Sequence, residues 1–220
     1  GGYPGGGGGY AGKPNIYLSG PRSAAFKVGL KYDINESNVL AAVPAHGKKY
    51  WEGHLDKETG HKIVTPTGST IDYLYYDFRF DPRKLQSNKK LCADKEKLIS
   101  LIAQDLESRG FLKNEVDDFT NFWRPRLFSK VKFCAYVQEN SQIDPVVSLE
   151  VSPPPSKSTR VWYFLVPDVT TAKLKKKVPA YASMWLDNKA TEGGFLFKKP
   201  SERAVASSEA PTRPVPALEV

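Results

Sequence analysis

Hydrophobic and polar residues alternate through most of the first 80 residues, which is the pattern of strands that bury one face. The alternation predicts strands over residues 15–18, 25–32, 38–43 and 50–55, and Gly, Pro or Asn punctuates most of the connections. A stretch at 62–65 continues the fourth strand after a turn. The first half of the chain is therefore predicted to be an antiparallel β layer.

The longest alternation covers residues 71–80 and predicts one more strand. One face of this strand carries Tyr73, Tyr75 and Asp77, together with Ile71 and Arg79. The opposite face is the better core candidate, and it consists of Asp72, Leu74, Tyr76, Phe78 and Phe80.

The middle of the chain changes to a helical period. Leu98, Ile99, Ile102 and Leu106 recur at helical spacing within residues 94–109, and a glycine follows that range to stop the helix. A second helix is predicted to have Asn114 as its N-cap and to end before Pro125. Its apolar stripe consists of Val116, Phe119, Phe122 and Trp123.

The second half of the chain returns to strands, predicted over residues 131–138, 146–151 and 161–166. Trp185 and residues 195–197 are expected to close the sheet. We therefore predict the α+β class: an antiparallel, β-rich, sandwich-like single domain over residues 13–200 with two central helices.

Both ends of the chain have compositions typical of flexible segments. Residues 1–12 are a Gly/Tyr-rich arm that is too poor in apolar side chains to offset its ordering entropy. Residues 201–220 are an Ala/Pro/Ser-rich tail. Because Gly-Tyr segments also associate through tyrosine stacking, a role of the arm in assembly stays open.

The formal net charge is +8 and the pI is 9.3, which favour acidic partners. Most basic residues are scattered, and the one dense run contains Lys175 and Lys176. These two lysines either belong to a solvated basic face or contribute to the attraction of an acidic polymer, and we do not expect nucleic-acid recognition. The sequence contains no run of about 20 apolar residues that would predict a membrane span.

Two features of the sequence favour secretion or the cell surface. Cys92 and Cys134 are the two cysteines, and either a disulfide or two buried thiols fit their positions. Asn35 begins an Asn-Glu-Ser triplet, which is the acceptor pattern for N-glycosylation.

The best candidates for chemistry are carboxylates beside aromatic side chains. Glu52 and Asp77 lie on neighbouring predicted strands and would serve as the acid and base of a glycosidase. Alternatively, Asp77 pairs with an arginine on a solvated face and the aromatic side chains cover the edge of the core. The aromatic platform predicted to bind a ligand consists of Tyr50, Trp51, Tyr73 and Tyr75.

The three histidines, His46, His54 and His61, lie within sixteen residues. Their spacings differ from the i, i+2 and i, i+4 patterns that are typical of metal sites. We therefore predict exposed histidines, no metal and no cofactor. No nucleophile elbow or phosphate-binding loop is present in the sequence.

Residues 13–18 (Lys-Pro-Asn-Ile-Tyr-Leu) resemble a Lys-Pro-x-Ile-Tyr-Leu-Tyr-Pro motif, although Ser-Gly-Pro at 19–21 replaces Tyr-Pro. This motif resembles the opening of a large family of bacterial and fungal proteins of unknown function. Residues 119–127 (Phe-Thr-Asn-Phe-Trp-Arg-Pro-Arg-Leu) resemble its helix end, Phe-Ile-x-Tyr-Trp-Leu-Pro-x-Leu. Weaker similarities occur at 50–52, 71–78 and 147–161. The resemblance implies an exported or surface-attached protein and implies no activity.

Three functions follow from these observations. The first is a non-enzymatic secreted or surface domain that binds a partner or builds an extracellular assembly. The second is a cell-wall polysaccharide hydrolase, or a carbohydrate-binding module, that uses Glu52 and Asp77. The third is an interaction module in which the Gly-rich arm adds a strand to the sheet edge of a neighbour.

Overall fold

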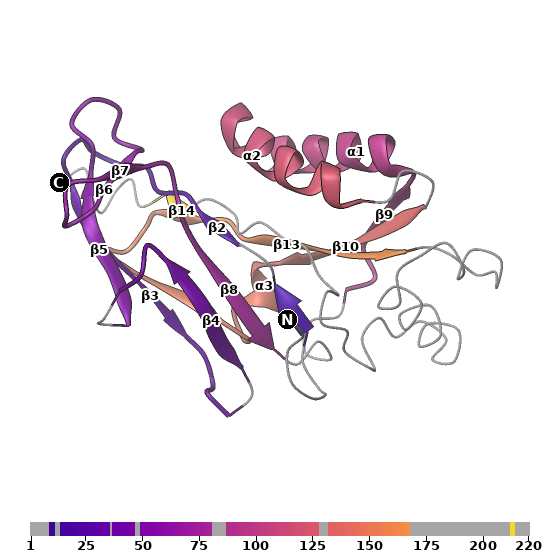
Figure 1. Ribbon diagram of the computed structural model, residues 1–220, viewed down its shortest axis with the longest axis horizontal. Helices are drawn as coiled ribbons and strands as arrows, with labels where there is room; N and C mark the ends of the chain where they lie inside the picture. The colour runs from indigo at the N-terminus through magenta and orange to yellow at the C-terminus, as the bar shows by residue number, and fades with distance from the viewer. Residues whose placement is uncertain are drawn as a thin grey trace.

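The protein is described by a computed structural model that covers residues 9–11, 14–35, 37–46, 49–80, 87–127, 132–167 and 212–213 (Figure 1). The model consists mostly of antiparallel β sheets with a few helices, which confirms the predicted α+β class. None of the helices in these residues is long and apolar enough to cross a membrane. Lys175, Lys176, Trp185 and residues 195–197 lie outside the described residues.

The first sheet is built around strand β8 (Leu74–Phe80). Strand β4 (Asn38–Val43) pairs with one edge of β8. Strands β2 (Asn15–Ile16) and β1 (Gly9–Ala11) pair with β8 at residues that β4 also contacts, so they lie along the opposite edge. Every second residue of β8 is buried, which confirms the predicted inward face of Leu74, Tyr76, Phe78 and Phe80.

The second sheet has the order β11-β3-β5-β6-β7. Its strands are β3 (Ala25–Lys31), β5 (Tyr50–Leu55), β6 (Ile63–Val64), β7 (Thr70–Ile71) and β11 (Ser148–Ser152). The predicted continuous strand over 71–80 is wrong in one respect. The chain leaves the second sheet after β7 and enters the first sheet at β8. The single predicted strand is therefore two strands, which belong to different sheets.

The third sheet contains β9 (Lys90–Ala93), β10 (Phe133–Glu139) and β13 (Val161–Pro167), with β10 in the centre. Consecutive residues of β10 from Phe133 to Gln138 are buried, because both faces of this sheet are covered. One face packs against an aromatic core that it shares with the first two sheets. The other face packs against two helices, as Figure 1 shows.

Helix α1 (Lys95–Ser108) and helix α2 (Lys113–Trp123) form this covering layer, and η2 (Arg124–Arg126) continues α2. The predicted N-cap at Asn114 is wrong, since the cap residue is Leu112. The Leu112 amide donates to the Glu115 carboxylate at 2.8 Å, so an acidic residue inside the first turn satisfies the backbone N–H of the cap residue. The four-residue helix α3 (Asn140–Ile143) was not predicted.

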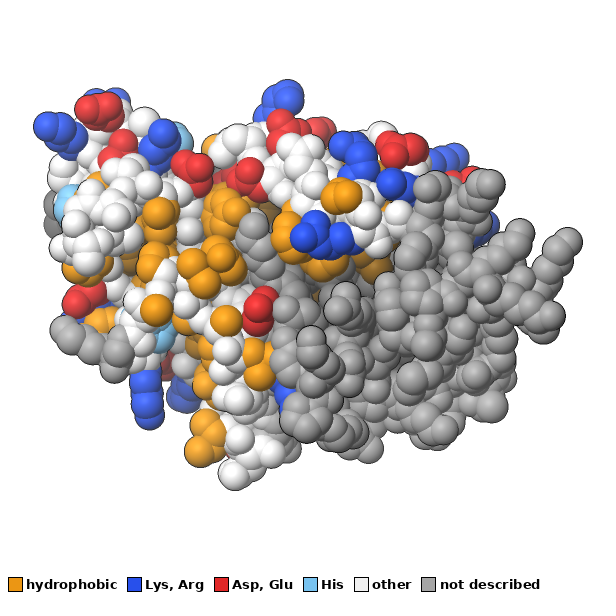
Figure 2. Space-filling view, in the orientation of Figure 1, with side chains coloured by type: hydrophobic (Ala, Val, Ile, Leu, Met, Phe, Trp, Pro, Cys, Tyr) orange, Lys and Arg blue, Asp and Glu red, His pale blue; other side chains and the backbone are white. Residues whose placement is uncertain are grey.

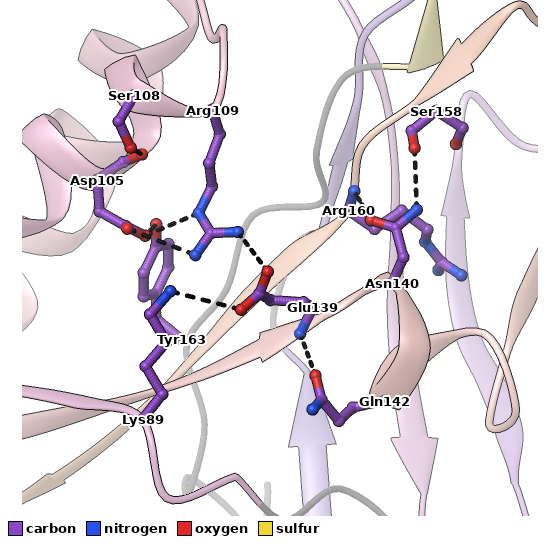
Figure 3. Close-up of polar contacts among 10 residues, drawn as sticks. All are labelled: Lys89, Asp105, Ser108, Arg109, Glu139, Asn140, Gln142, Ser158, Arg160 and Tyr163. Carbon is purple, nitrogen blue, oxygen red and sulfur yellow. Dashed lines mark hydrogen bonds and ion pairs between the residues drawn. The ribbon is translucent and has the colours of Figure 1, made fainter.

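A polar network ties α1 to the third sheet (Figure 3). The Tyr163 hydroxyl of β13 donates to the Asp105 carboxylate of α1. The Arg109 guanidinium donates to Asp105 at 2.9 Å and to Glu139 at 3.1 Å, and Lys89 reaches Glu139 at 3.5 Å. Burial, followed by the neighbouring Asp105 charge, raises the pKa of Tyr163 well above its usual value, so the hydroxyl stays protonated.

Short strands also occur inside both predicted tails. Strand β1 lies within the Gly/Tyr-rich arm and pairs with the end of β8, with Gly9 opposite Phe80 and Ala11 opposite Phe78. Strand β14 (Thr212–Arg213) lies within the Ala/Pro/Ser-rich tail and pairs with β12 (Lys157–Ser158). Each tail therefore contributes backbone pairing to the domain.

Candidate functional site

The structure does not assemble the four aromatic residues predicted as a platform. Trp51 is only 3% exposed, its indole N–H donates to the Pro44 carbonyl at 2.8 Å, and its ring packs on His46. Trp51 is therefore a core residue, and its predicted role in ligand binding is corrected. Tyr50 lies on the outer face of the second sheet, where the Lys27 ammonium approaches its ring to 5.1 Å.

Tyr73 and Tyr75 do lie together. Their ring centroids are 6.0 Å apart, and both rings are half-buried. Tyr73 comes from the crossing between the second and first sheets, and Tyr75 lies on the outer face of β8. A third ring, Tyr17, packs edge-on against Tyr73 with centroids 5.4 Å apart. These three side chains, Tyr17, Tyr73 and Tyr75, form the tyrosine cluster.

Tyr17 is the anchored member of the tyrosine cluster. Its hydroxyl donates to the Asp118 carboxylate of α2 at 2.8 Å and accepts from the Asn15 side-chain amide at 3.2 Å. Burial, reinforced by the Asp118 charge, raises the pKa of Tyr17 far above its usual value. The ring is thus a fixed, neutral support for Tyr73, and it connects the first sheet to the helix layer.

A narrow pocket opens beside Tyr17, between the segment after β2, the turn after β5 and the start of α2. Figure 2 shows hydrophobic side chains gathered between α2 and the strands β2 and β8, with acidic side chains at their upper border. The pocket supplies hydroxyl, amide, imidazole and carboxyl groups. It is lined by Tyr17, Leu18, Ser19, His61, Asp72, Leu112, Asn114 and Glu115.

Glu52 and Asp77 do not share a pocket. Glu52 follows the inward-facing Trp51 on β5, and Asp77 lies between the inward-facing Tyr76 and Phe78 on β8. Because side chains alternate along a strand, each carboxylate lies on the outer face of its own sheet, with the shared core between the two sheets. This geometry contradicts the predicted acid–base pair, which needs both groups to face one cleft.

The three histidines are also separate. His46 packs on Trp51, His54 is exposed on β5, and His61 lines the pocket beside Tyr17. Within the described residues, no group of three or more His, Cys, Asp or Glu side chains is placed to hold a metal ion. Slight burial opposes ionisation of Asp56, but hydrogen bonds from Thr59, Gly60 and Lys62 lower its pKa to about 2, so this carboxylate shapes a turn.

The two cysteines form a disulfide between adjacent strands. Cys92 of β9 lies directly opposite Cys134 of β10. The alternative of two buried thiols is therefore overturned in this structure.

Sequence reasoning missed most of the pocket. Tyr17 and Asp118 are 101 residues apart, and no local pattern connects them. Asp72 was assigned to the inward face of a strand, but it is exposed because the strand is interrupted there. The signal that was available is the pair Tyr73 and Tyr75 on one face of an alternating segment.

Comparison of the chain with protein-family models, with curated proteins and with solved structures gave no match. The resemblance to a family of exported proteins therefore remains a prediction. Any proposal about function has to start from the geometry described above.

Proposed function

We propose that this chain is a non-enzymatic domain of an exported or cell-surface protein, and that it binds a polysaccharide at the tyrosine cluster and its pocket. The observation that carries the proposal is the contact of Tyr73 with both Tyr75 and Tyr17, next to a pocket rich in hydrogen-bonding groups. The pocket has a volume of only about 30 Å³, so it would admit a single hydroxyl group, and the aromatic rings would carry the faces of the sugar units.

The chemistry of the cluster suits sugars. The apolar C–H face of a sugar ring packs on an aromatic ring, and two rings 6.0 Å apart offer support to successive units of a chain. A hydroxyl of one unit would bond to the pocket side chains Asp72 and Asn114. The exposed Asp72 carboxylate lines the pocket, so an acidic polymer would bring like charge close to it. We therefore favour a neutral polysaccharide.

Export is supported by the disulfide between Cys92 and Cys134. Disulfides persist in oxidising compartments and are rare where glutathione keeps thiols reduced. The acidic-polymer alternative depended on Lys175 and Lys176, which lie outside the described residues.

Binding to insoluble cellulose, chitin and β-glucan, followed by affinity electrophoresis in soluble glucans, tests the proposal. Tyr73→Ala and Tyr75→Ala should each weaken binding about tenfold, equivalent to roughly 1.4 kcal/mol. Tyr50→Ala is the matched control, because Tyr50 is a half-buried tyrosine on the outer face of the other sheet. Indifference to every polysaccharide, or equal losses for all three variants, would contradict the proposal.

A second candidate function is assembly by strand donation, and strand β1 favours it. The arm is held on β8 by backbone pairing over three residues, and this pairing is equally available to the arm of a second copy. In one chain, the short connection to β2 keeps the arm at an effective concentration of about millimolar. Exchange between copies is therefore expected only at high local density, as on a surface.

Cysteine trapping separates the two arrangements of the arm. Tyr10 and Arg79 are paired in register, so a copy with Tyr10→Cys and a tagged copy with Arg79→Cys should form a mixed disulfide when they are concentrated together. The control pair is Asn38→Cys with Arg79→Cys. Asn38 is also paired with Arg79, but it lies on strand β4 and not on the arm. Equal yields of the mixed species from both pairs would remove strand donation.

A further inference from the structure

We propose that Asn35 carries an N-linked glycan in the natural protein. The proposal rests on the export that the proposed function includes, and it does not depend on the ligand of the tyrosine cluster. Residues 35–37 (Asn-Glu-Ser) are the one Asn-x-Ser/Thr triplet in the 220-residue sequence. Such triplets are modified only where the chain is accessible, and the position of this one in the fold favours modification.

Asn35 lies in the connection between β3 and β4, where the chain passes from the second sheet to the first. The Asn35 side chain is exposed, whereas Ser37 is buried in the folded chain, so the sugar would be transferred before this turn folds. The turn is held by Asp33, whose carboxylate accepts from the Asn35 backbone amide at 2.9 Å and whose carbonyl accepts from the Ser37 amide at 2.9 Å. Substitution on the Asn35 side-chain nitrogen would leave both of these bonds intact.

The neighbouring residue gives the glycan a surface to cover. Ile34 is 79% exposed, and it is one of two large hydrophobic side chains described as exposed, the other being Leu112. A sugar attached to the next residue lies within reach of Ile34 and can pack its apolar face on that side chain. The glycan would therefore both shield the apolar tip of the turn and enlarge the polar surface there.

The position is also compatible with polysaccharide binding. Strand β4 leaves the turn with Asn38 opposite Arg79 and reaches Tyr75 only at Val43. Arg79 and Tyr75 are four residues apart on β8, so the turn is at least about 13 Å from the tyrosine cluster at ~3.3 Å per residue. Figure 1 shows the β3–β4 connection at the lower end of the molecule, away from β7 and α2.

The modification is a group transfer with a defined co-reactant, a polyisoprenyl diphosphate-linked oligosaccharide. The Asn35 amide nitrogen forms a bond to the anomeric carbon of the first sugar and gives up a proton. The bond between that carbon and the diphosphate oxygen breaks, and polyisoprenyl diphosphate leaves. The compartment that performs this transfer in eukaryotic cells also supports disulfides such as the one between Cys92 and Cys134.

Expression of the full chain behind a signal peptide in a yeast secretory host tests the proposal. Intact mass of the protein from the medium and from the cell extract should exceed that of the unmodified chain, which is 24.5 kDa without the signal peptide. Peptide N-glycosidase should remove the excess and convert Asn35 to Asp. Asn35→Gln and Ser37→Ala should abolish the modification, while Ser37→Thr and the neighbouring control Asn38→Gln should retain it.

An unmodified wild-type chain that carries the native disulfide would overturn the inference. Polysaccharide binding by Asn35→Gln, measured beside the wild type, keeps the two proposals apart. If the wild type binds polysaccharide but carries no glycan, the glycan proposal fails and the proposed function stands. If it carries a glycan but binds no polysaccharide, the proposed function fails and the glycan proposal stands.

Discussion

The two faces of the third sheet use the same strands but treat polar groups differently. On the helix-covered face, Phe133, Ala135, Val137, Val161 and Tyr163 pack against α1 and α2. On the opposite face, Cys134, Tyr136, Trp162 and Phe164 enter the aromatic core that all three sheets share. One network of charges borders the first face, whereas polar atoms penetrate the interior of the second.

The helix side keeps its polar groups at the border and pairs them. Tyr163 reaches Asp105 through its hydroxyl, and Arg109 joins Asp105 to Glu139. Bonding to Arg109 lowers the pKa of Glu139, so the carboxylate stays charged down to acidic pH. This border contains hydrogen bonds to charged acceptors, which are stronger than neutral ones.

The aromatic side buries polar groups in its interior. Arg160 is 1% exposed, and it donates to Asp144 at 2.8 Å, to the Val147 carbonyl and to the Tyr76 hydroxyl at 3.4 Å. Gln138 faces Trp162 across the strands. Among the described residues, the Gln138 amide and the Trp162 indole N–H have no hydrogen-bond partner. The polar groups on the helix side therefore stabilise the fold, whereas some of the polar groups buried on the aromatic side lower its stability.

Removal of the disulfide should have the largest effect, because it holds the edge of the sheet that both faces share. Cys92→Ala with Cys134→Ala opens a loop of 42 residues and should lower the free energy of unfolding by about 4 kcal/mol. Chemical denaturation of the double variant, compared with the oxidised and reduced wild type, measures this loss. If reduction alone costs nothing, the sheet does not depend on the bond.

Arg160 is expected to have the next largest effect, on the aromatic side only. Arg160→Ala leaves the Val147 carbonyl and the Tyr76 hydroxyl inside the core without their donor, at a cost of about 3 kcal/mol. The control Lys157→Ala removes a basic side chain that is exposed, and it should change stability by less than about 0.5 kcal/mol. Similar denaturation midpoints for the two variants would show that the buried arginine contributes little.

The sequence alone predicted the elements of both faces better than their contacts. Strands β4 and β5 were predicted with the bounds that the structure has, because short alternating segments between turn residues define them. The break between β7 and β8 was missed, since the alternation continues through residues 72–73 although the chain changes sheets there. Local patterns carry no information about which sheet a strand joins.

The candidate site was predictable only in part, for the same reason. Tyr73 and Tyr75 lie on one face of the strand predicted over 71–80, so they were singled out from the sequence, and their rings do lie together. Their support by Tyr17, and its bond to Asp118, depends on helix α2 packing beside the start of the chain. Trp51 was misjudged because a tryptophan on an alternating strand fits the core as well as a platform.

Substitution of Gln138 should raise the stability of the fold, whereas substitution of Arg160 should lower it. Gln138→Leu replaces a fully buried amide with an apolar side chain of similar size, so stability should rise by about 1 kcal/mol. The matched variant is Gln142→Leu, because this glutamine does have a partner. Its side-chain carbonyl accepts from the Glu139 backbone amide at 2.7 Å at the start of α3. That variant should lose about 1 kcal/mol. Destabilisation by both would show that Gln138 has a partner that stabilises the fold.

Tyr163→Phe tests the helix side with a smaller and pH-dependent effect. Near neutral pH the loss of the hydroxyl that donates to Asp105 should cost about 1 kcal/mol, because Arg109 still satisfies part of that carboxylate. The raised pKa of Tyr163 means that the native state keeps this proton after the unfolded state has released it. The stabilisation is therefore complete below pH of about 10 and declines as the pH rises above that value.

The variant lacks that titration, so its unfolding free energy should approach that of the wild type in urea melts taken from pH 8 to pH 11.5. Tyr17 and Tyr76, whose pKa values burial also raises, still titrate in the variant, so it retains a smaller alkaline loss. A difference between the two proteins that stays constant across this range would mean that the Tyr163 proton is not coupled to folding. In that case the hydroxyl would matter only for packing, and the polar border of the helix side would depend on Arg109 alone.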